Sequence, residues 1–262
     1  MIMNRRVALG GTQLDSLDDS IVIRSTDPGV ARENVSAVDR MGGIGQRITS
    51  EHWSVLEASV TFAIDIPKRQ LTDRREVFDK VIAWALGKGW LTMNQMPDKR
   101  LYVDKVVLPG GGDMWEWTNE YTITFKAYDV PFWQDDEATE ATIAAADEGS
   151  GSITVPGLME TVCDAEITNA SGNTIDSMSV TVGSSVMSFT SLGLADEEKL
   201  VIGHEGGTLY IRIYTGSSYF RRAMDKRTGS SADDLYVTPG AKAITITGGS
   251  VTAKVSCFGR YV

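Results

Sequence analysis

The chain has 262 residues, of which 42% are hydrophobic, and it carries a formal net charge of −10 at pH 7. This composition is ordinary for a globular protein with a core, and the acidic charge argues against a protein whose task is to bind nucleic-acid phosphates. No apolar run approaches the roughly 20 residues of a membrane-spanning helix, so we expect no membrane role. The first residues are not followed by the apolar stretch of a secretory signal peptide, so we expect synthesis in a cytoplasm.

Alternating apolar residues predict strands in the first half of the sequence. The segment "DSIVIRST" alternates, and "WSVLEASVTFAIDIP" does so over a greater length. In the longer segment, every second residue from Val60 to Ile66 lies on one face, and Pro67 ends the run because proline cannot donate to a strand ladder.

One segment has helical spacing instead. In "TDRREVFDKVIAWALGKG", the apolar residues between Val77 and Ala85 recur at intervals typical of one helix face. Asp73 is predicted to cap the helix, with Glu76 completing a capping box. Gly87 is predicted to be the left-handed residue that ends it.

Two more strands follow, "RLYVDKVVLP" and "MWEWTNEYTITFKAYD", with "PGGGD" as the hairpin loop between them. In the second strand, one face is predicted to be nearly continuous and apolar, with only one polar residue. Its members are Trp115, Trp117, Asn119, Tyr121, Ile123, Phe125 and Ala127.

The stretch "DVPFWQDDEATEAT" marks a predicted domain boundary. Pro131 interrupts the strand, Phe132 and Trp133 are expected to fold back under the first core, and "QDDEATEAT" reads as a polar exit. All six tryptophans precede this junction. Residues 1–134 carry 16 Lys and Arg against 18 Asp and Glu, whereas residues 135–262 carry 9 against 17. We therefore predict one domain over 1–134 and a second, more acidic one over 135–262.

The second half consists of short strands separated by Gly, Asn or Pro turns, with no helical stripe. Such spacing is typical of an antiparallel sandwich or barrel. The predicted fold is thus mainly β, with an N-terminal sheet domain that holds one α-helix, followed by an antiparallel β-sandwich.

Catalytic and metal-binding patterns are missing from the sequence. His52, at the start of a strand, and His204, in a turn, are read as surface residues, and no nucleophile elbow, zinc motif or calcium loop is present. The acidic clusters at 135–137 and 196–198 read as solvated linker and turn. We predict no enzyme activity, no cofactor and no metal, although a pair of carboxylates for glycoside hydrolysis stays open.

The two cysteines, Cys163 and Cys257, are expected to be free and buried, with a bridge after release from the cell left open. Three tyrosines are candidates for contact with a glycan or a protein. Tyr210 and Tyr214 share one face of "TLYIRIYTG", opposite an aliphatic face, and Tyr219 follows.

The order of these segments resembles the distal tail proteins of long-tailed, non-contractile bacteriophages and related prophages. The residues that carry the resemblance are the junction "ITFKAYDVPFWQ", then "AEITNASGN" and "EKLVIG", and the ending "LYVTPGAKAITITGG" with "FGRYV". The start, "VALGGTQLDS", also fits the short hairpin at the beginning of that family's chains.

The resemblance implies a structural protein of the virion, located at the tail tip. The first domain would form a ring, usually of six subunits, that joins the tail tube protein to the tail-tip proteins and leaves a channel for DNA. The second domain would be a galectin-like sandwich that hangs outward. The family has no catalytic residue to transfer to this chain.

The alternative is a binding module whose sandwich recognises host cell-surface glycan through tyrosines such as Tyr210 and Tyr214. The chain is too short for the large sugar-binding insertions of many relatives, which disfavours direct receptor binding. If the ring forms, Trp115 and Trp117 are candidates for its subunit interface, because a closed ring buries strand edges and aromatic side chains.

Overall fold

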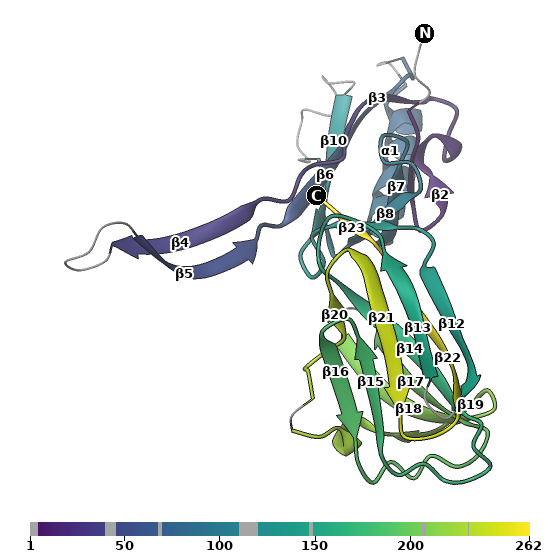
Figure 1. The fold of residues 1–262 in the computed structure, drawn as a ribbon. Helices are drawn as coiled ribbons and strands as arrows, with labels where there is room; N and C mark the ends of the chain where they lie inside the picture. Colours follow the sequence, from purple (N-terminus) through teal and green to yellow (C-terminus); the bar gives the residue numbers. More distant parts are fainter. Residues whose placement is uncertain are drawn as a thin grey trace. The chain divides into compact units, whose positions relative to one another are not determined.

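The computed structural model describes residues 5–39, 46–67, 70–109, 120–146, 149–205, 208–229 and 231–262. The fold is mainly antiparallel β with one α-helix among these residues, as predicted (Figure 1). The chain divides into two compact units, Met1–Trp133 together with Val262, and Gln134–Tyr261.

The first unit contains ten strands in its described part, one α-helix and one short 3-10 helix, η1 (Leu14–Ser16). The strands and the helix are β1 (Val7–Leu9), β2 (Thr12–Gln13), β3 (Ile21–Asp27), β4 (Glu33–Asp39), β5 (Gln46–Trp53), β6 (Leu56–Ile64), α1 (Leu71–Ala85), β7 (Gly89–Met93), β8 (Lys99–Val103), β9 (Lys105–Val107) and β10 (Glu120–Ala127). Strand β11 (Trp133–Asp135) lies at the division between the units.

The second unit is built from strands and a second short 3-10 helix, η2 (Met224–Lys226). The strands are β12 (Thr139–Ala146), β13 (Gly149–Val155), β14 (Thr161–Asn169), β15 (Met178–Val182), β16 (Ser185–Phe189), β17 (Glu198–Glu205), β18 (Thr208–Thr215), β19 (Ser218–Arg222), β20 (Tyr236–Val237), β21 (Gly240–Thr247), β22 (Val251–Cys257) and β23 (Arg260–Tyr261).

The core of the first unit follows the alternation of its longest strands. Strands β3, β6, β10 and β9 form one sheet in that order, and β2, β1, β7 and β8 are neighbours in another. In β10, the apolar face from Tyr121 to Ala127 is buried, as the period of two predicted. The earlier residues of that predicted face, from Trp115 to Asn119, lie outside the described residues. Strand β6 ends at Ile64, before the predicted Ile66.

Helix α1 packs its apolar stripe against β10. The ring of Phe78 lies 4.9 Å from that of Tyr121, and the ring of Trp84 lies 6.0 Å from that of Phe125, measured between centroids. The indole Nε1 of Trp84 also donates a hydrogen bond of 2.9 Å to the carbonyl oxygen of Thr12 in β2. The helix therefore contacts both sheets of the first unit.

Both predicted ends of the helix are wrong by a few residues. The residue before the first turn is Gln70, without a side-chain cap, and Asp73 lies inside the first turn, where its charge favours the positive end of the helix dipole. At the other end, the left-handed residues are Lys88, with φ 52°, and Gly89, with φ 113°, rather than Gly87.

The predicted strand "RLYVDKVVLP" is two strands in different sheets. Asp104 separates β8 from β9, and its backbone N–H donates to the carbonyl of Lys126. Its carboxylate accepts hydrogen bonds from the backbone N–H groups of Tyr128 and Asp129. The polar residue in the run thus marks the point where the chain passes from one sheet to the other.

The junction residues behave as predicted on the side of the first unit. Phe132 and Trp133 are buried, the indole of Trp133 donates to the carbonyl of Pro28 at 3.0 Å, and Phe132 lies edge-on to Trp53. The prediction that "QDDEATEAT" is a polar linker is partly wrong, because its last residues form the beginning of strand β12.

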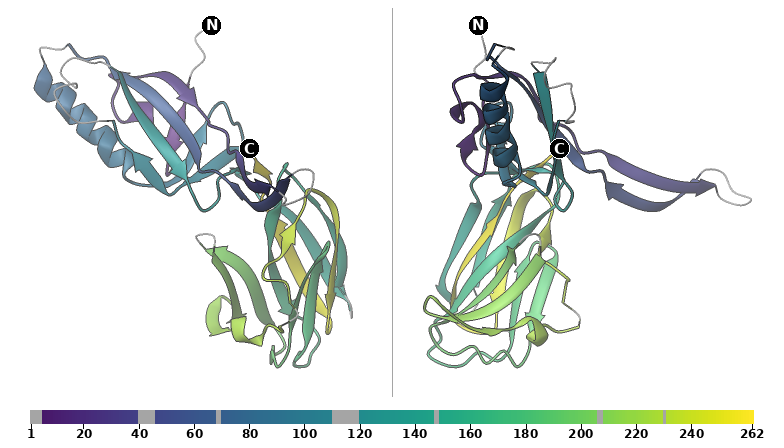
Figure 2. Two further views of the ribbon diagram at one scale, coloured as in Figure 1. Left: turned by 90° about the vertical axis from the view of Figure 1, so that its left-hand side faces the viewer. Right: turned by 180° about the vertical axis from the view of Figure 1, so that it is seen from behind.

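A two-stranded arm was not predicted. Strands β4 and β5 pair with each other along their length and with no other described strand (Figures 1 and 2). Within the first unit, the arm extends away from the two sheets. Its base is closed by two hydrogen bonds, from Ser54 N–H to the carbonyl of Arg32 and from Arg32 N–H to Oγ of Ser54.

The second unit is an antiparallel sandwich, as predicted. One sheet has the order β12-β22-β14-β17-β18-β19, with β20 also on β14, and the other has the order β13-β21-β15-β16. Their alternate residues form one hydrophobic cluster that extends from Ile143 to Cys257. Cys163 and Cys257 are both buried in this cluster, directly opposite each other on β14 and β22.

The two ends of the second unit are joined by hydrogen bonds. The backbone N–H of Asp135 donates to the carbonyl of Gly259, and Gly259 N–H donates back to the Asp135 carboxylate at 3.0 Å. The hydroxyl of Tyr261 donates to the same carboxylate oxygen at 3.4 Å. The first and last residues of the unit are therefore neighbours.

Across the described ranges, no helix combines the length and apolar character needed to span a membrane.

Candidate binding surface on the second unit

The predicted site residues fall into two groups. Trp115 and Trp117, the candidates for a ring interface, lie outside the described residues. Tyr210, Tyr214 and Tyr219 lie on β18 and β19, the last two strands of the larger sheet.

The alternation of β18 separates a core face from an outer face. Ile211 and Ile213 are buried in the sandwich, and Tyr210 and Tyr214 are half-buried on the opposite side. Tyr219 of β19 is 57% exposed, and its ring meets that of Tyr214 edge-on at 5.9 Å between centroids. The structure thus places the three tyrosines along one edge of the sheet, on its last two strands.

Tyr210 does not present a bare ring to solvent. It lies directly opposite Gly203 of β17, where an added Cβ would stand only 2.6 Å from the Tyr210 hydroxyl oxygen. The guanidinium carbon of Arg212 lies 4.2 Å from the ring centroid, which is the geometry of a cation–π contact. The ring of Tyr210 therefore supports Arg212, and the surface presents a guanidinium at this point.

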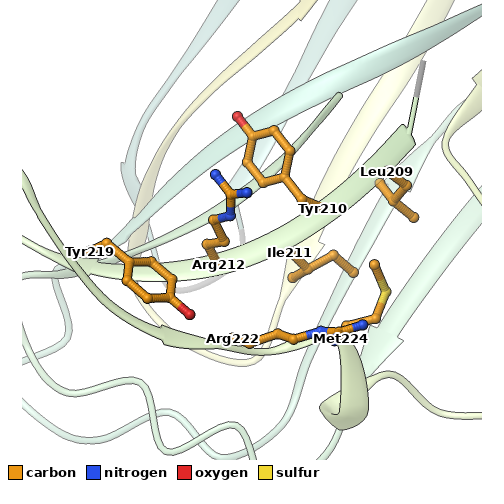
Figure 3. Close-up of a pocket in the computed structure, with 7 residues that line it drawn as sticks. All are labelled: Leu209, Tyr210, Ile211, Arg212, Tyr219, Arg222 and Met224. Carbon is orange, nitrogen blue, oxygen red and sulfur yellow. The ribbon is translucent and has the colours of Figure 1, made fainter. Parts of the chain in front are cut away.

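Arg212 is held by further contacts. It is hydrogen bonded to Tyr214, which raises the pKa of Arg212 above its ordinary value. One of its terminal nitrogens lies 3.3 Å from a carboxylate oxygen of Glu205. Across the strand pair, its register partner is Arg222 of β19. The two arginines are therefore register partners, but their side chains diverge, with Arg212 beside Tyr210 and Arg222 beside Met224 (Figure 3).

A small concavity lies beside this pair, with a volume of about 270 Å³ (Figure 3). Its polar side chains are Tyr210, Arg212, Tyr219 and Arg222, and its apolar ones are Leu209, Ile211 and Met224. Sequence reasoning missed both arginines. The "TGSS" turn between the two strands could have predicted the hairpin, but an unbroken hairpin register would pair Arg212 with Arg221, and a register shift between Ile213 and Tyr214 makes Arg222 its partner.

His204 was predicted to be a surface residue in a turn, and this is wrong. It lies inside β17, half-buried, with Nδ1 2.6 Å from Oδ1 of Asp164 and Nε2 2.7 Å from Oδ2 of Asp234. Burial lowers the pKa of His204, but hydrogen bonds with Asp164 and Asp234, and their charges, outweigh burial and raise the pKa to about 9. The imidazole is therefore a cation at neutral pH and joins two carboxylates.

The cluster of His204, Asp164 and Asp234 lies where β14 changes the strand with which it pairs. On one side, β14 pairs with β20 at Thr161 and Val162, and with β17 from Ala165 onward. Asp164 lies at the change, and His204 spans from it to the segment before β20. The two carboxylates bind opposite nitrogens of one ring, so they do not converge on a point where a metal could bind. No other described group of three or more His, Cys, Asp or Glu has a metal-binding arrangement either.

His52, predicted at the start of a strand, lies near the end of β5 and is exposed. The acidic clusters predicted as solvated also have structural roles. Glu198 is buried and accepts a hydrogen bond from Ala195 N–H, and Asp196 accepts one from Gly172 N–H. Their carboxylates fix the turns that precede β17.

The fold is similar to that of known phage proteins. The crystal structure of SPP1 Dit, a hub of the adsorption apparatus in phages that infect Gram-positive bacteria, aligns over 98% of this chain and 99% of its own, with a TM-score of 0.70 and 12% sequence identity. The phage P2 baseplate, in its activated conformation with calcium, aligns over 97% of this chain and 98% of its own with a TM-score of 0.48 and 10% identity. The sequence matches no protein-family model and no curated protein.

Proposed function

We propose that this chain is a structural distal tail protein that acts as a hub at the tip of a phage tail and so belongs to the virion. The observation that carries the proposal is the likeness to SPP1 Dit, which covers both units and nearly the full length of both chains. In this role, the protein holds other tail proteins in place and carries out no catalysis.

We further propose that the first unit assembles into a ring, of six subunits by family analogy, with a central channel for DNA. The β4–β5 arm supports this. Its backbone pairs with no other described strand, and Val35 and Ile48 on it are 50% and 54% exposed. A subunit that packs against the arm would bury this apolar surface, and closure of the ring would leave no arm uncovered.

The partners in this arrangement are the tail tube protein on one side and tail-tip proteins on the other. The domain roles follow from the same proposal, with residues 1–134 forming the ring and residues 135–262 forming a peripheral, galectin-like sandwich. The uneven charge of the two halves is compatible with a subunit-packed ring and a solvated periphery.

The test is the mass of the purified chain in solution, by size-exclusion chromatography with light scattering, together with negative-stain images of the same fraction. We expect a mass several times that of one chain, with six the expected multiple, and particles with a central hole. A chain that stays monomeric alone and also after mixing with its tail tube protein would contradict the ring.

A second candidate function is glycan binding by the sandwich, and one observation favours it. The concavity of about 270 Å³ beside the exposed ring of Tyr219 offers a place for a small ligand. Tyr210 offers no bare ring face on the side of Arg212, whose guanidinium carbon lies 4.2 Å from the ring centroid. A glycan array with the purified chain tests this candidate, and an array without binding above background would remove it.

A further inference from the structure

The two cysteines of the chain lie where neighbouring strands bring side chains closest together. Cys163 of β14 and Cys257 of β22 are register partners in an antiparallel pair. The backbone N–H of Cys163 donates to the carbonyl of Leu235, on the side of β14 that pairs with β20, at 3.0 Å. Since the N–H and C=O groups of one residue in an antiparallel strand point to the same side, Cys163 and Cys257 form a pair without backbone hydrogen bonds to each other.

A pair of this kind has the geometry of a disulfide bond. Its Cα atoms are typically about 4.5 Å apart, and disulfides join Cα atoms that are about 4.4–6.8 Å apart. Both side chains lie in the hydrophobic cluster between the two sheets, and their thiols are hydrogen bonded to each other. A bond between the two sulfur atoms therefore requires no change of strand register.

The contact makes the two thiols unequal. The hydrogen bond from Cys163 lowers the pKa of Cys257, and the same hydrogen bond, together with burial, raises the pKa of Cys163. The thiolate is the reactive form of a cysteine, so Cys257 is the first to react. Cys257 is 2% exposed and Cys163 is 0% exposed, so the oxidant that suits the pair is a small molecule such as hydrogen peroxide.

We propose that Cys163 and Cys257 are a redox pair that a peroxide converts to a disulfide bond, and that this bond stabilises the second unit. In the first step, the Cys257 sulfur attacks one peroxide oxygen, the O–O bond breaks, and Cys257 becomes a sulfenic acid as the other oxygen leaves with the thiol proton as water. In the second step, the Cys163 sulfur attacks the Cys257 sulfur, the S–O bond breaks, and the hydroxyl group leaves with the Cys163 proton as a second water. The two thiols lose two electrons, and the peroxide gains them.

The bond acts where the chain closes the second unit. It joins β14 to the end of β22 and so encloses the intervening strands in one covalent loop. The residues after Cys257 already contribute to this closure, because the carbonyl of Phe258 accepts from the Thr161 hydroxyl and Gly259 N–H donates to Asp135. A covalent link restricts the unfolded state and thereby stabilises the folded one. A reducing cytoplasm keeps such thiols free, so the bond forms after the protein leaves the cell.

The test begins with the full chain, reduced with dithiothreitol and then desalted. Hydrogen peroxide is added to the folded protein, the free thiols are counted after denaturation, and tryptic peptides are mapped by mass spectrometry. We expect the count to fall from two thiols per chain to none, and we expect a linked pair of peptides that contain Cys163 and Cys257. The chains should run as single chains on a non-reducing gel.

Calorimetry measures the effect on stability. All six tryptophans lie at or before residue 133, so the second unit gives the thermal transition that tryptophan fluorescence does not follow. Its midpoint should rise by roughly 5–10 °C after peroxide treatment, and dithiothreitol should reverse the rise.

Cys163→Ala and Cys257→Ala are matched controls, because each removes one thiol from the same place in the core. Peroxide should raise the midpoint of neither variant. In Cys163→Ala, Cys257 should stop at the sulfenic acid, which dimedone traps, and this labelling should exceed that of Cys257→Ala by about fivefold. Equal labelling of the two variants would overturn the order of the two steps. If a variant fails to fold, the linked peptides of the unmodified chain still decide whether the bond forms.

Three other results would overturn the proposal. They are a count that stays at two thiols, oxidation of both thiols to sulfinic or sulfonic acids without linked peptides, and a linked chain whose second unit has an unchanged or lower midpoint. The inference does not rest on the hub proposal or on glycan binding, and its failure would leave both unaffected.

Discussion

At the scale of single residues, the charge state of His204 has a consequence for stability. Its pKa of about 9 lies well above the ordinary value of 6.5. A group whose pKa rises on folding stabilises the folded state fully below its unfolded pKa, and this contribution is lost as the pH rises through the folded pKa. The full shift corresponds to about 3 kcal/mol, and partial exposure of Asp164 reduces our expectation to about 2 kcal/mol.

We therefore expect His204→Gln to lower the free energy of unfolding of the second unit by about 2 kcal/mol at pH 6. The deficit should shrink as the pH rises from about 6.5 to 9.5, because the imidazolium of the unmodified chain is lost over that window. Urea unfolding of both chains at several pH values measures it. The control is His52→Gln, on an exposed residue, and a deficit that is independent of pH would contradict the assigned charge.

The same residue shows why the site could be predicted only in part. The alternation of β18 was visible in the sequence because Ile211 and Ile213 share a core face. The partners of His204 were not visible, because Asp164 and Asp234 lie 40 and 30 residues away and meet it only through the change of partner along β14. A cation paired across such distances leaves no local pattern.

At the scale of elements, the arm is where the sequence was least informative. Strands such as β6 and β10 were predicted because one of their faces is buried, which imposes a period of two on the apolar residues. Strands β4 and β5 pair only with each other, and most of their described side chains are exposed. Without a buried face, no alternation is required, and nothing marked them as strands. The helix was predicted because its stripe is buried, and its ends were misplaced because the predicted cap was not used.

The arm also gives a sharp test of assembly. If the chain assembles into the proposed ring, replacing residues 34–52 with Asn-Gly, a two-residue hairpin turn, should leave a folded first unit that does not form it. Glu33 and Trp53 remain as the paired ends, so the contact of Trp53 with Phe132 and the bonds between Arg32 and Ser54 are kept.

Light scattering gives the mass of this variant, and circular dichroism with thermal unfolding reports its fold. The matched control replaces the "TGSS" turn of the second unit, residues 215–218, with Thr-Asn-Gly-Ser, and should assemble like the unmodified chain. A variant without the arm that still forms the full ring would show that the arm is not part of the subunit contact.

At the scale of the whole molecule, the chain has separate cores. The hydrophobic cluster from Ile143 to Cys257 contains residues of the second unit only. Units with their own cores unfold as separate cooperative transitions when their stabilities differ. The sequence predicted a division at this junction from its tryptophans, all six of which lie at or before residue 133.

We expect calorimetry of the full chain to resolve two thermal transitions. His204→Gln should lower the midpoint of one and leave the other unchanged, which assigns each transition to its unit. Tryptophan fluorescence should follow only the unaffected transition, because all six tryptophans lie at or before residue 133. A single transition that His204→Gln shifts as a whole would show that the two units unfold together.

The bonds between Asp135 and Gly259 have a consequence for how such proteins diversify. The first and last residues of the sandwich are hydrogen-bonded neighbours, so the chain enters and leaves this domain at the same place. Any domain whose ends lie about one strand spacing apart, roughly 5 Å, can take its place by recombination without a change in the preceding unit. Selection can then act on the sandwich separately from the first unit.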